Sequence, residues 1–115
     1  MKDIDRQIAE KIMGWIPNED GDWNTKDGHW CGYYNHEWHP STNITQALQA
    51  MEEIINDTLW FQLTAVHGRG YEVTIFKAGL GKRTKHSLKN ELVTEFENTV
   101  SLAICKAALE TMEKL

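Results

Sequence analysis

The chain has 115 residues, which is enough for one domain with a hydrophobic core of its own, so stability requires neither a metal nor a disulfide. The net charge is −5, and the charges are unevenly distributed along the chain. Residues 1–57 hold eleven acidic and four basic side chains, whereas residues 58–115 hold six acidic and eight basic side chains. This balance argues against general nucleic-acid binding, which needs clustered Lys and Arg to neutralise phosphates. The acidic first half suits a basic protein partner, or it only keeps the protein soluble.

The composition predicts a soluble protein of a reducing cytoplasm, with one domain over residues 1–115. Two cysteines do not make the spaced framework of a disulfide-bonded secreted domain, and Cys105 is expected to be a small core residue. Charged Asp3, Asp5 and Arg6 stand where a signal peptide needs an apolar segment, and no apolar run reaches membrane-spanning length. We therefore expect neither a leader nor membrane contact.

The first predicted element is an amphipathic helix over residues 3–13. Ile4, Ile8 and Ile12 recur every four residues and form its apolar stripe. Gly14 follows at a position typical of a helix C-terminal stop. The helix is expected to lie flat on a core.

Residues 18–40 have the Gly, Asp and Asn content of a loop, yet they are rich in large aromatic residues. These are Trp23, Trp30, Tyr33, Tyr34 and Trp38. Either the segment wraps around the core and buries its rings, which is the favoured interpretation, or the rings line a groove.

Four potential zinc ligands lie in the same segment. His29, Cys31, His36 and His39 form a His-x-Cys-x4-His-x2-His pattern. The gap between the two pairs is shorter than the usual finger loop, and histidines beside tryptophans are more often packing residues. No metal is predicted, and these four residues remain weak candidates.

A second helix is predicted to begin at Thr42 or Asn43 and to end near Asn56 and Asp57. Either residue can cap the helix, and Gln46, three residues after Asn43, imitates a capping box. The apolar stripe of this helix consists of Ala47, Leu48, Met51, Ile54 and Ile55.

Alternating apolar residues predict a β-hairpin with strands over residues 59–66 and 71–77. Both apolar sets are odd-numbered, so they share one sheet face only if the loop has an odd number of residues. We expect a Gly68–Gly70 loop that places Leu63 opposite Ile75. The other face carries Trp60, Val66 and Phe76, and it is apolar enough to predict that it is covered as well.

The last third of the chain predicts a loop, a short strand and a helix. The glycine spacing in residues 79–84 does not fit a phosphate loop, so a solvated turn is expected there. Residues 91–96 are β-prone and suit the edge of a sheet. Residues 98–115 then predict a helix capped by Asn98 or Thr99, which is apolar around most of its circumference and therefore buried on most sides.

Three blocks of the sequence resemble the phage ABA-sandwich domain, a family of small phage and prophage proteins. The blocks are Ala9–Trp15, Pro40–Ala47 and Leu102–Leu109. The resemblance implies an α+β fold, a three-layer α/β/α sandwich in which a small antiparallel sheet with a β-hairpin has about three helices on its two faces. It implies no established activity. The sequence departs from the family at Asn43, commonly Asp, and at residues 100–101, where a small residue and Pro are common.

No enzyme is predicted, because no nucleophile elbow, paired-carboxylate motif or phosphate loop accompanies the histidines, and no cofactor is expected. The first functional hypothesis is a phage accessory protein that acts as a binding module, with a small anionic ligand in an aromatic pocket. The pocket would consist of Tyr34, His36, Trp38, His39, Lys82 and Arg83.

Two alternatives compete with this hypothesis. The acidic half could bind or inhibit a host protein, or the domain could be purely structural and form oligomers. In a competing interpretation of the aromatic residues, Trp30, Tyr33 and Trp38 pack across the sheet face that bears Trp60 and Phe76.

Overall fold

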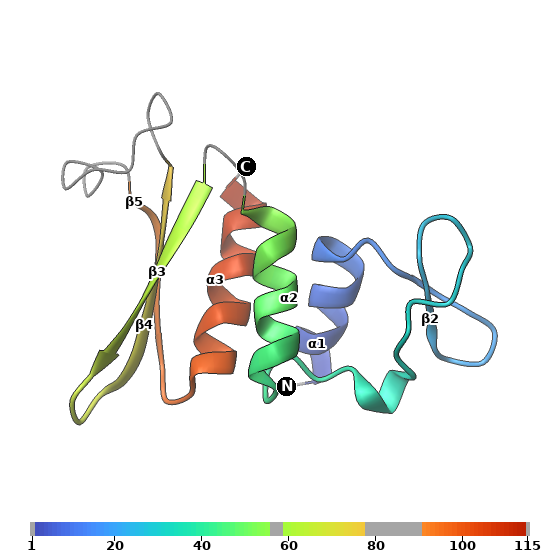
Figure 1. The fold of residues 1–115 in the computed structure, drawn as a ribbon, viewed down its shortest axis with the longest axis horizontal. Coiled ribbons are helices and arrows are strands. Elements are labelled where there is room, and N and C mark those ends of the chain that lie inside the picture. Colours follow the sequence, from blue (N-terminus) through green and yellow to red (C-terminus); the bar gives the residue numbers. More distant parts are fainter. Residues whose placement is uncertain (1, 56–58, 78–90, 115) are drawn as a thin grey trace.

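The computed structural model describes residues 2–55, 59–77 and 91–114. Figure 1 shows the elements side by side: a three-stranded sheet, then α3 and α2, then α1, and finally a looped segment with two short strands. The elements are α1 (Lys2–Gln7), a π-helical turn (Ile8–Ile12), β1 (Ile16–Pro17), β2 (Trp23–Asn24), a 3-10 turn (Asn35–Glu37), α2 (Ile44–Ile54), β3 (Leu59–Val66), β4 (Gly70–Lys77), β5 (Glu91–Glu97) and α3 (Val100–Lys114).

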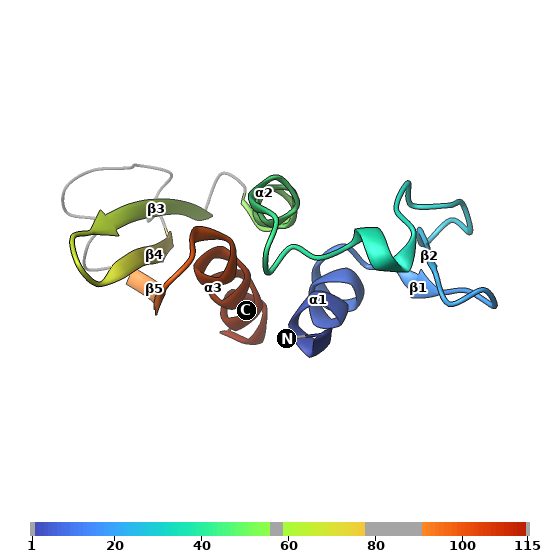
Figure 2. The ribbon, with the colours of Figure 1, turned by 90° about the horizontal axis from the view of Figure 1, so that it is seen from below.

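The predicted α+β class is confirmed: the described residues form three α-helices and two small antiparallel sheets, with strand orders β1-β2 and β3-β4-β5. The described helices lie on one side of the three-stranded sheet, where α3 packs on β4 and β5 and separates them from α1 (Figures 1 and 2). The expected cover on both faces is therefore met on one face only within the described residues.

The second face is stabilised by contacts within the sheet. Trp60 and Phe76 are cross-strand partners, and their rings stack with centroids 4.4 Å apart. The middle of this face is polar, because Thr74 donates a hydrogen bond to a Glu72 carboxylate oxygen and lies beside Thr94. Each large ring thus covers part of the other.

Helix α3 forms the centre of the core, as its composition predicted. Ala103, Ile104 and Cys105 are fully buried, as are Ala107 and Ala108 one turn later. Burial, helped by the negative charge of Asp5, raises the pKa of the Cys105 thiol to about 12. Cys105 is therefore a neutral core side chain, as expected.

The predicted first helix changes character halfway. It is α-helical only as far as Gln7, and residues 8–12 form a π-helical turn. The Met13 N–H donates to the Ile8 carbonyl at 3.0 Å, and Gly14 follows in the left-handed region at φ 73°. Gly14 is therefore the C-terminal stop that the sequence predicted, because a left-handed residue ends a helix most readily when it lacks a Cβ.

Helix α2 begins as predicted. The Asn43 Oδ1 accepts a hydrogen bond from the Gln46 backbone N–H at 3.0 Å. The helix ends at Ile54, two to three residues before the expected end. The Gln46 side chain does not complete a capping box. Its Oε1 accepts from the His39 N–H at 2.7 Å, and its Nε2 donates to the Glu37 carbonyl at 2.7 Å.

The hairpin register differs from the predicted one by two residues. Leu63 lies opposite Val73 instead of Ile75, so the loop consists of residues 67–69. The Arg69 N–H donates to the Val66 carbonyl at 3.0 Å, with Gly68 at φ 74°. A positive φ at the third position is typical of a type II turn, so the turn closes around Gly68. The odd-numbered side chains still share one face, as predicted.

The last strand and helix also follow the sequence pattern. Strand β5 is at the edge of the sheet, beside β4. Thr99 caps α3, since its hydroxyl accepts from the Leu102 N–H at 3.3 Å. Among the described helices, none combines the length and the apolar character needed to cross a membrane.

Candidate binding surface

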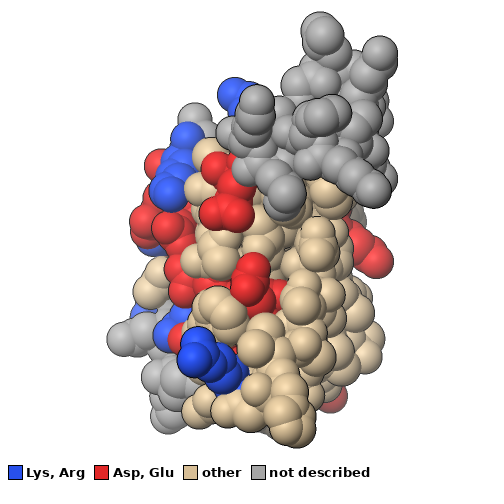
Figure 3. Space-filling view, turned by 90° about the vertical axis from the view of Figure 1, so that its left-hand side faces the viewer, with Lys and Arg blue, Asp and Glu red and all other residues tan. Residues whose placement is uncertain are grey.

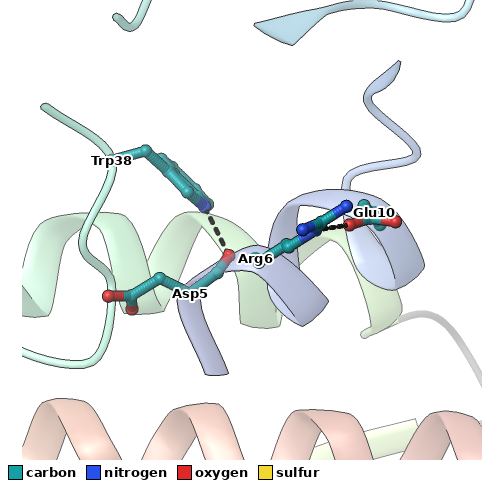
Figure 4. Close-up of polar contacts among 4 residues, drawn as sticks. All are labelled: Asp5, Arg6, Glu10 and Trp38. Carbon is teal, nitrogen blue, oxygen red and sulfur yellow. Dashed lines mark hydrogen bonds and ion pairs between the residues drawn. The ribbon is translucent and has the colours of Figure 1, made fainter. Parts of the chain in front are cut away.

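Buried aromatic rings attach the looped segment, residues 14–43, to the helices. Trp15 and Trp38 pack edge to face with centroids 4.6 Å apart, and Tyr33 lies 5.3 Å from Trp38. The Tyr33 hydroxyl donates to Gln49 Oε1 on α2 at 2.8 Å. The Trp38 indole N–H donates to the Asp5 carbonyl oxygen on α1 at 3.1 Å, as Figure 4 shows beside the Arg6–Glu10 ion pair. These bonds anchor the segment between α1 and α2.

The Asp5 side chain makes a further hydrogen bond to the looped segment. Its Oδ1 accepts from the Ser41 N–H at 2.8 Å, across 36 positions of sequence. Together with the two hydrogen bonds of the buried Gln46 side chain, this contact holds the backbone of residues 37–41 against the helices. The base of the looped segment is therefore well ordered by packing and hydrogen bonds.

The outer part of the segment exposes three neighbouring rings, which we call the aromatic ladder: Trp30, Tyr34 and His36. The Trp30 and Tyr34 centroids are 5.0 Å apart, and Tyr34 and His36 stack 5.8 Å apart at an interplanar angle of 4°. Trp30 is 52% exposed and Tyr34 48% exposed. Single exposed apolar residues are ordinary, but adjoining rings form a continuous surface of the kind that partners bind.

Local turns explain why these rings point outwards. Gly28 and Gly32 flank Trp30 with φ of 84° and 99°, and an isolated bridge pairs Trp30 with Asn24. A Glu37 carboxylate oxygen accepts from the Tyr34 N–H at 2.8 Å. The left-handed conformation of both glycines, which residues with a Cβ rarely adopt, bends the chain on either side of the exposed Trp30.

The ladder lies in acidic surroundings. Residues 14–43 contain five acidic side chains and one basic side chain, Lys26, besides three histidines. Glu37 touches the backbone of the ladder directly, and Asp27 is exposed in the turn that precedes it. Rings in such a field attract cations, since the ring faces and the carboxylates carry the same sign of potential.

The structure places the predicted pocket residues in different environments. Tyr34 and His36 stack on each other at the surface, whereas Trp38 is 4% exposed and packs in the core. His39 is exposed, and its Nδ1 lies 3.1 Å from the Thr42 hydroxyl. Lys82 and Arg83 lie outside the described residues, so the six-residue pocket stays a prediction.

The weak zinc candidates have separate contacts. The Cys31 Sγ donates to the Tyr33 carbonyl at 3.4 Å, and the His36 ring stacks on Tyr34. Among the residues that the structure describes, no three His, Cys, Asp or Glu side chains are grouped closely enough to hold a metal ion.

The interpretation that the rings cover the sheet is wrong. Residues 14–43 lie on the side of α1 and α2 away from the three-stranded sheet (Figure 1). Trp38 packs with Trp15 and Tyr33 there, and Trp60 instead stacks with its strand neighbour Phe76. The hydrogen bonds to Asp5 and Gln49 explain the difference, because they tie the segment to the first two helices.

Two carboxyl groups that sequence reasoning missed meet where β5 packs on α3. The hydrogen bond between Glu95 and Glu110, with burial and the Glu110 charge, raises the pKa of Glu95 to about 7. The same hydrogen bond, with a contribution from Lys114, lowers the pKa of Glu110. Lys106 Nζ lies 2.6 Å from Glu97, and Lys114 Nζ lies 3.4 Å from Glu110. The pair can release or take up one proton near neutral pH. The flanking lysines are typical of a surface ion-pair network.

Sequence reasoning also left Trp30 out of the predicted site. The flanking Gly28 and Gly32 are the signal that could have indicated an exposed ring, because glycine-rich turns usually lie at the protein surface. No sequence pattern, in contrast, brings Glu95 to Glu110.

Comparison with known proteins agrees with this fold. Residues 6–109 match the family described as the phage ABA sandwich domain. No curated protein and no solved structure matches the chain. The family match covers nearly the whole chain and indicates a phage-associated protein. The chain therefore belongs to the phage ABA sandwich domain family.

Proposed function

We propose that the protein is a non-enzymatic binding module that holds a basic segment of a host protein against the aromatic ladder. The observation that carries this proposal is a pair of adjoining half-exposed rings, Trp30 and Tyr34, of which Tyr34 also stacks on His36. They lie in a segment with five acidic side chains and one Lys. The non-enzymatic part rests on the absence of a catalytic motif in the sequence.

The physical basis is a combination of stacking and charge. An Arg guanidinium stacks on Trp and Tyr faces and gains cation–π energy, on the order of 0.5–2 kcal/mol for each contact. Glu37 and its acidic neighbours attract the same cation at longer range. The anchored base of the segment means that the rings lose little freedom on binding, which favours affinity.

A small anionic ligand is less well supported. The acidic side chains of residues 14–43 repel an anion, and two of the cations named in the first hypothesis, Lys82 and Arg83, lie outside the described residues. The anionic-ligand hypothesis therefore enters the experiment as the competing outcome.

The test is calorimetric titration of the protein with an Arg-rich peptide and, separately, with ATP. We expect the peptide to bind, its affinity to fall steeply as salt is raised, and ATP not to bind. Trp30→Ala and Tyr34→Ala should each weaken peptide binding by about tenfold or more, as removal of a central aromatic anchor does.

Phe96→Ala is the matched control. Phe96 is 47% exposed, nearly the same as the two ladder rings, but it lies on β5. The control should bind the peptide as the wild type does, and thermal melts should show that all three variants stay folded. Equal weakening in Phe96→Ala, or binding of ATP in place of the peptide, would contradict the proposal.

A further inference from the structure

Among the described residues, no strand pairs with the outer edge of β3. In the strand order β3-β4-β5 it has one neighbour, β4, within the described residues. All eight of its residues, LWFQLTAV, are uncharged, and none is proline. Protein sheets usually protect such an edge with a charge, a proline or a bulge, because an open edge pairs readily with another strand.

The turn indicates which backbone groups face outwards. The Val66 carbonyl accepts from the Arg69 N–H, so the backbone groups of Val66 point toward β4. The direction alternates along a strand, and therefore the N–H and C=O groups of Phe61, Leu63 and Ala65 point to the open edge.

The side chains of the same residues are incompletely covered. Phe61 and Leu63 are opposite the core residues Ile75 and Val73, so odd-numbered side chains lie on the face toward α3. Helix α3 packs over β4 and β5, so Leu63 remains 41% exposed and Ala65 is exposed. An apolar row thus continues up to the open edge without a cover.

We propose that two copies of the protein form a symmetric dimer in which their β3 strands pair antiparallel, giving one continuous sheet of six strands, three from each copy. A two-fold axis perpendicular to the sheet keeps the same face upward in both copies. Residues that pair across the axis must therefore both be odd-numbered or both be even-numbered, so their two residue numbers add up to an even number. An axis at Leu63 satisfies this condition, with Leu63 opposite its own copy and Phe61 opposite Ala65. The exposed apolar row of each copy then meets the other.

The charge pattern favours a second copy at β3 over one at β5. Pairing of β5 with itself would bring Glu91 opposite Glu97 and crowd four carboxylates at the contact, which is unfavourable. Self-pairing of β3 brings no charges together. Figure 3, which looks onto the sheet face away from α3, shows acidic and basic side chains toward the β5 side and mostly uncharged surface toward the β3 side.

The first experiment measures molar mass by light scattering and sedimentation across a range of protein concentrations. We expect the wild type to have twice the chain mass of 13.3 kDa. Leu63→Lys places like charges opposite each other at the axis and should raise the dissociation constant by about tenfold or more. Because Leu63 is partly exposed, the monomer should stay folded, and Ala65→Lys serves as the second variant.

The matched control is Thr94→Lys, which puts the same side chain at the centre of the other edge strand, where Thr94 is exposed. This variant should remain dimeric. Amide hydrogen exchange supplies an independent readout: the amides of Phe61, Leu63 and Ala65 should be protected in the wild type and exchange faster in Leu63→Lys. A monomeric wild type, or a dimer that Leu63→Lys leaves intact, overturns the proposal.

Discussion

At the scale of single residues, Glu95 shows how the fold changes an ordinary side chain. Its hydrogen bond with Glu110 raises the pKa of Glu95 from 4.5 to about 7, so the folded protein holds this proton more tightly than the unfolded chain does. The resulting stabilisation is fully present below about pH 4.5, and it is lost as the pH rises through 7. Above pH 7, two carboxylates face each other.

Glu95→Gln should therefore stabilise the protein only at high pH. The amide keeps a hydrogen bond to Glu110 but removes the repulsion, so the melting temperature should exceed that of the wild type by roughly 2–5 °C at pH 8 and by almost nothing at pH 4.5. Partial solvent screening of the pair keeps the effect small. Thermal melts at several pH values measure it.

Glu91→Gln is the control, because it removes a charge from the same strand without touching Glu110. Its effect on the melting temperature should change little between these pH values. An increase in the melting temperature of Glu95→Gln that is the same at all pH values would contradict the conclusion that Glu95 holds a proton near neutral pH.

At the scale of elements, Gly70 determines how closely the end of β5 approaches the start of β4. Its φ is 105°, and a Cβ added there would overlap the Glu97 backbone carbonyl oxygen. Gly68, two residues earlier, has φ 74° with open space around it. An added Cβ therefore causes backbone strain alone at Gly68, but both backbone strain and steric overlap at Gly70.

Gly70→Ala should destabilise the protein more than Gly68→Ala. Strain alone costs roughly 1–2 kcal/mol at a left-handed position, whereas Gly70→Ala must also push the β5 backbone away. Chemical denaturation of both variants measures the difference in the free energy of unfolding. Equal losses would mean that Glu97 does not pack on Gly70.

At the scale of the whole molecule, α3 connects the sheet to the other helices, because it contacts β4, β5, α1 and α2. Ile104 lies at its centre with no exposed surface. Met112, on the same helix, is 38% exposed. A charged side chain would therefore be buried away from water at position 104 and solvated at position 112.

Ile104→Asp should unfold the domain, since an uncompensated buried charge costs several kcal/mol, on the order of the whole stability of a small domain. Met112→Asp should stay folded, because water still solvates its carboxylate. Circular dichroism during heating distinguishes the two outcomes. A cooperative melt of Ile104→Asp at the wild-type temperature would refute the central place of α3.

The sequence by itself determined the elements with a regular pattern. The four-residue repeat of Ile4, Ile8 and Ile12, the cap at Asn43 and the alternation over residues 59–66 each depend on neighbours within one turn of helix or one strand. Such local patterns need no knowledge of the fold, because the period of apolar residues must match the period of the element that buries them. The apolar circumference of α3 likewise indicated a buried helix.

The tertiary structure decided what depends on residues far apart. The choice of buried and exposed rings followed from hydrogen bonds such as that between Trp38 and Asp5, 33 positions away. The hairpin register is a local exception, because the sequence offers both Gly68 and Gly70 for the turn and the chain turns around Gly68. The looped segment has no apolar period, so the sequence indicated Tyr34 and His36 by composition alone. The Glu95–Glu110 contact and the open edge of β3 likewise appeared only in the fold, since each depends on which elements become neighbours.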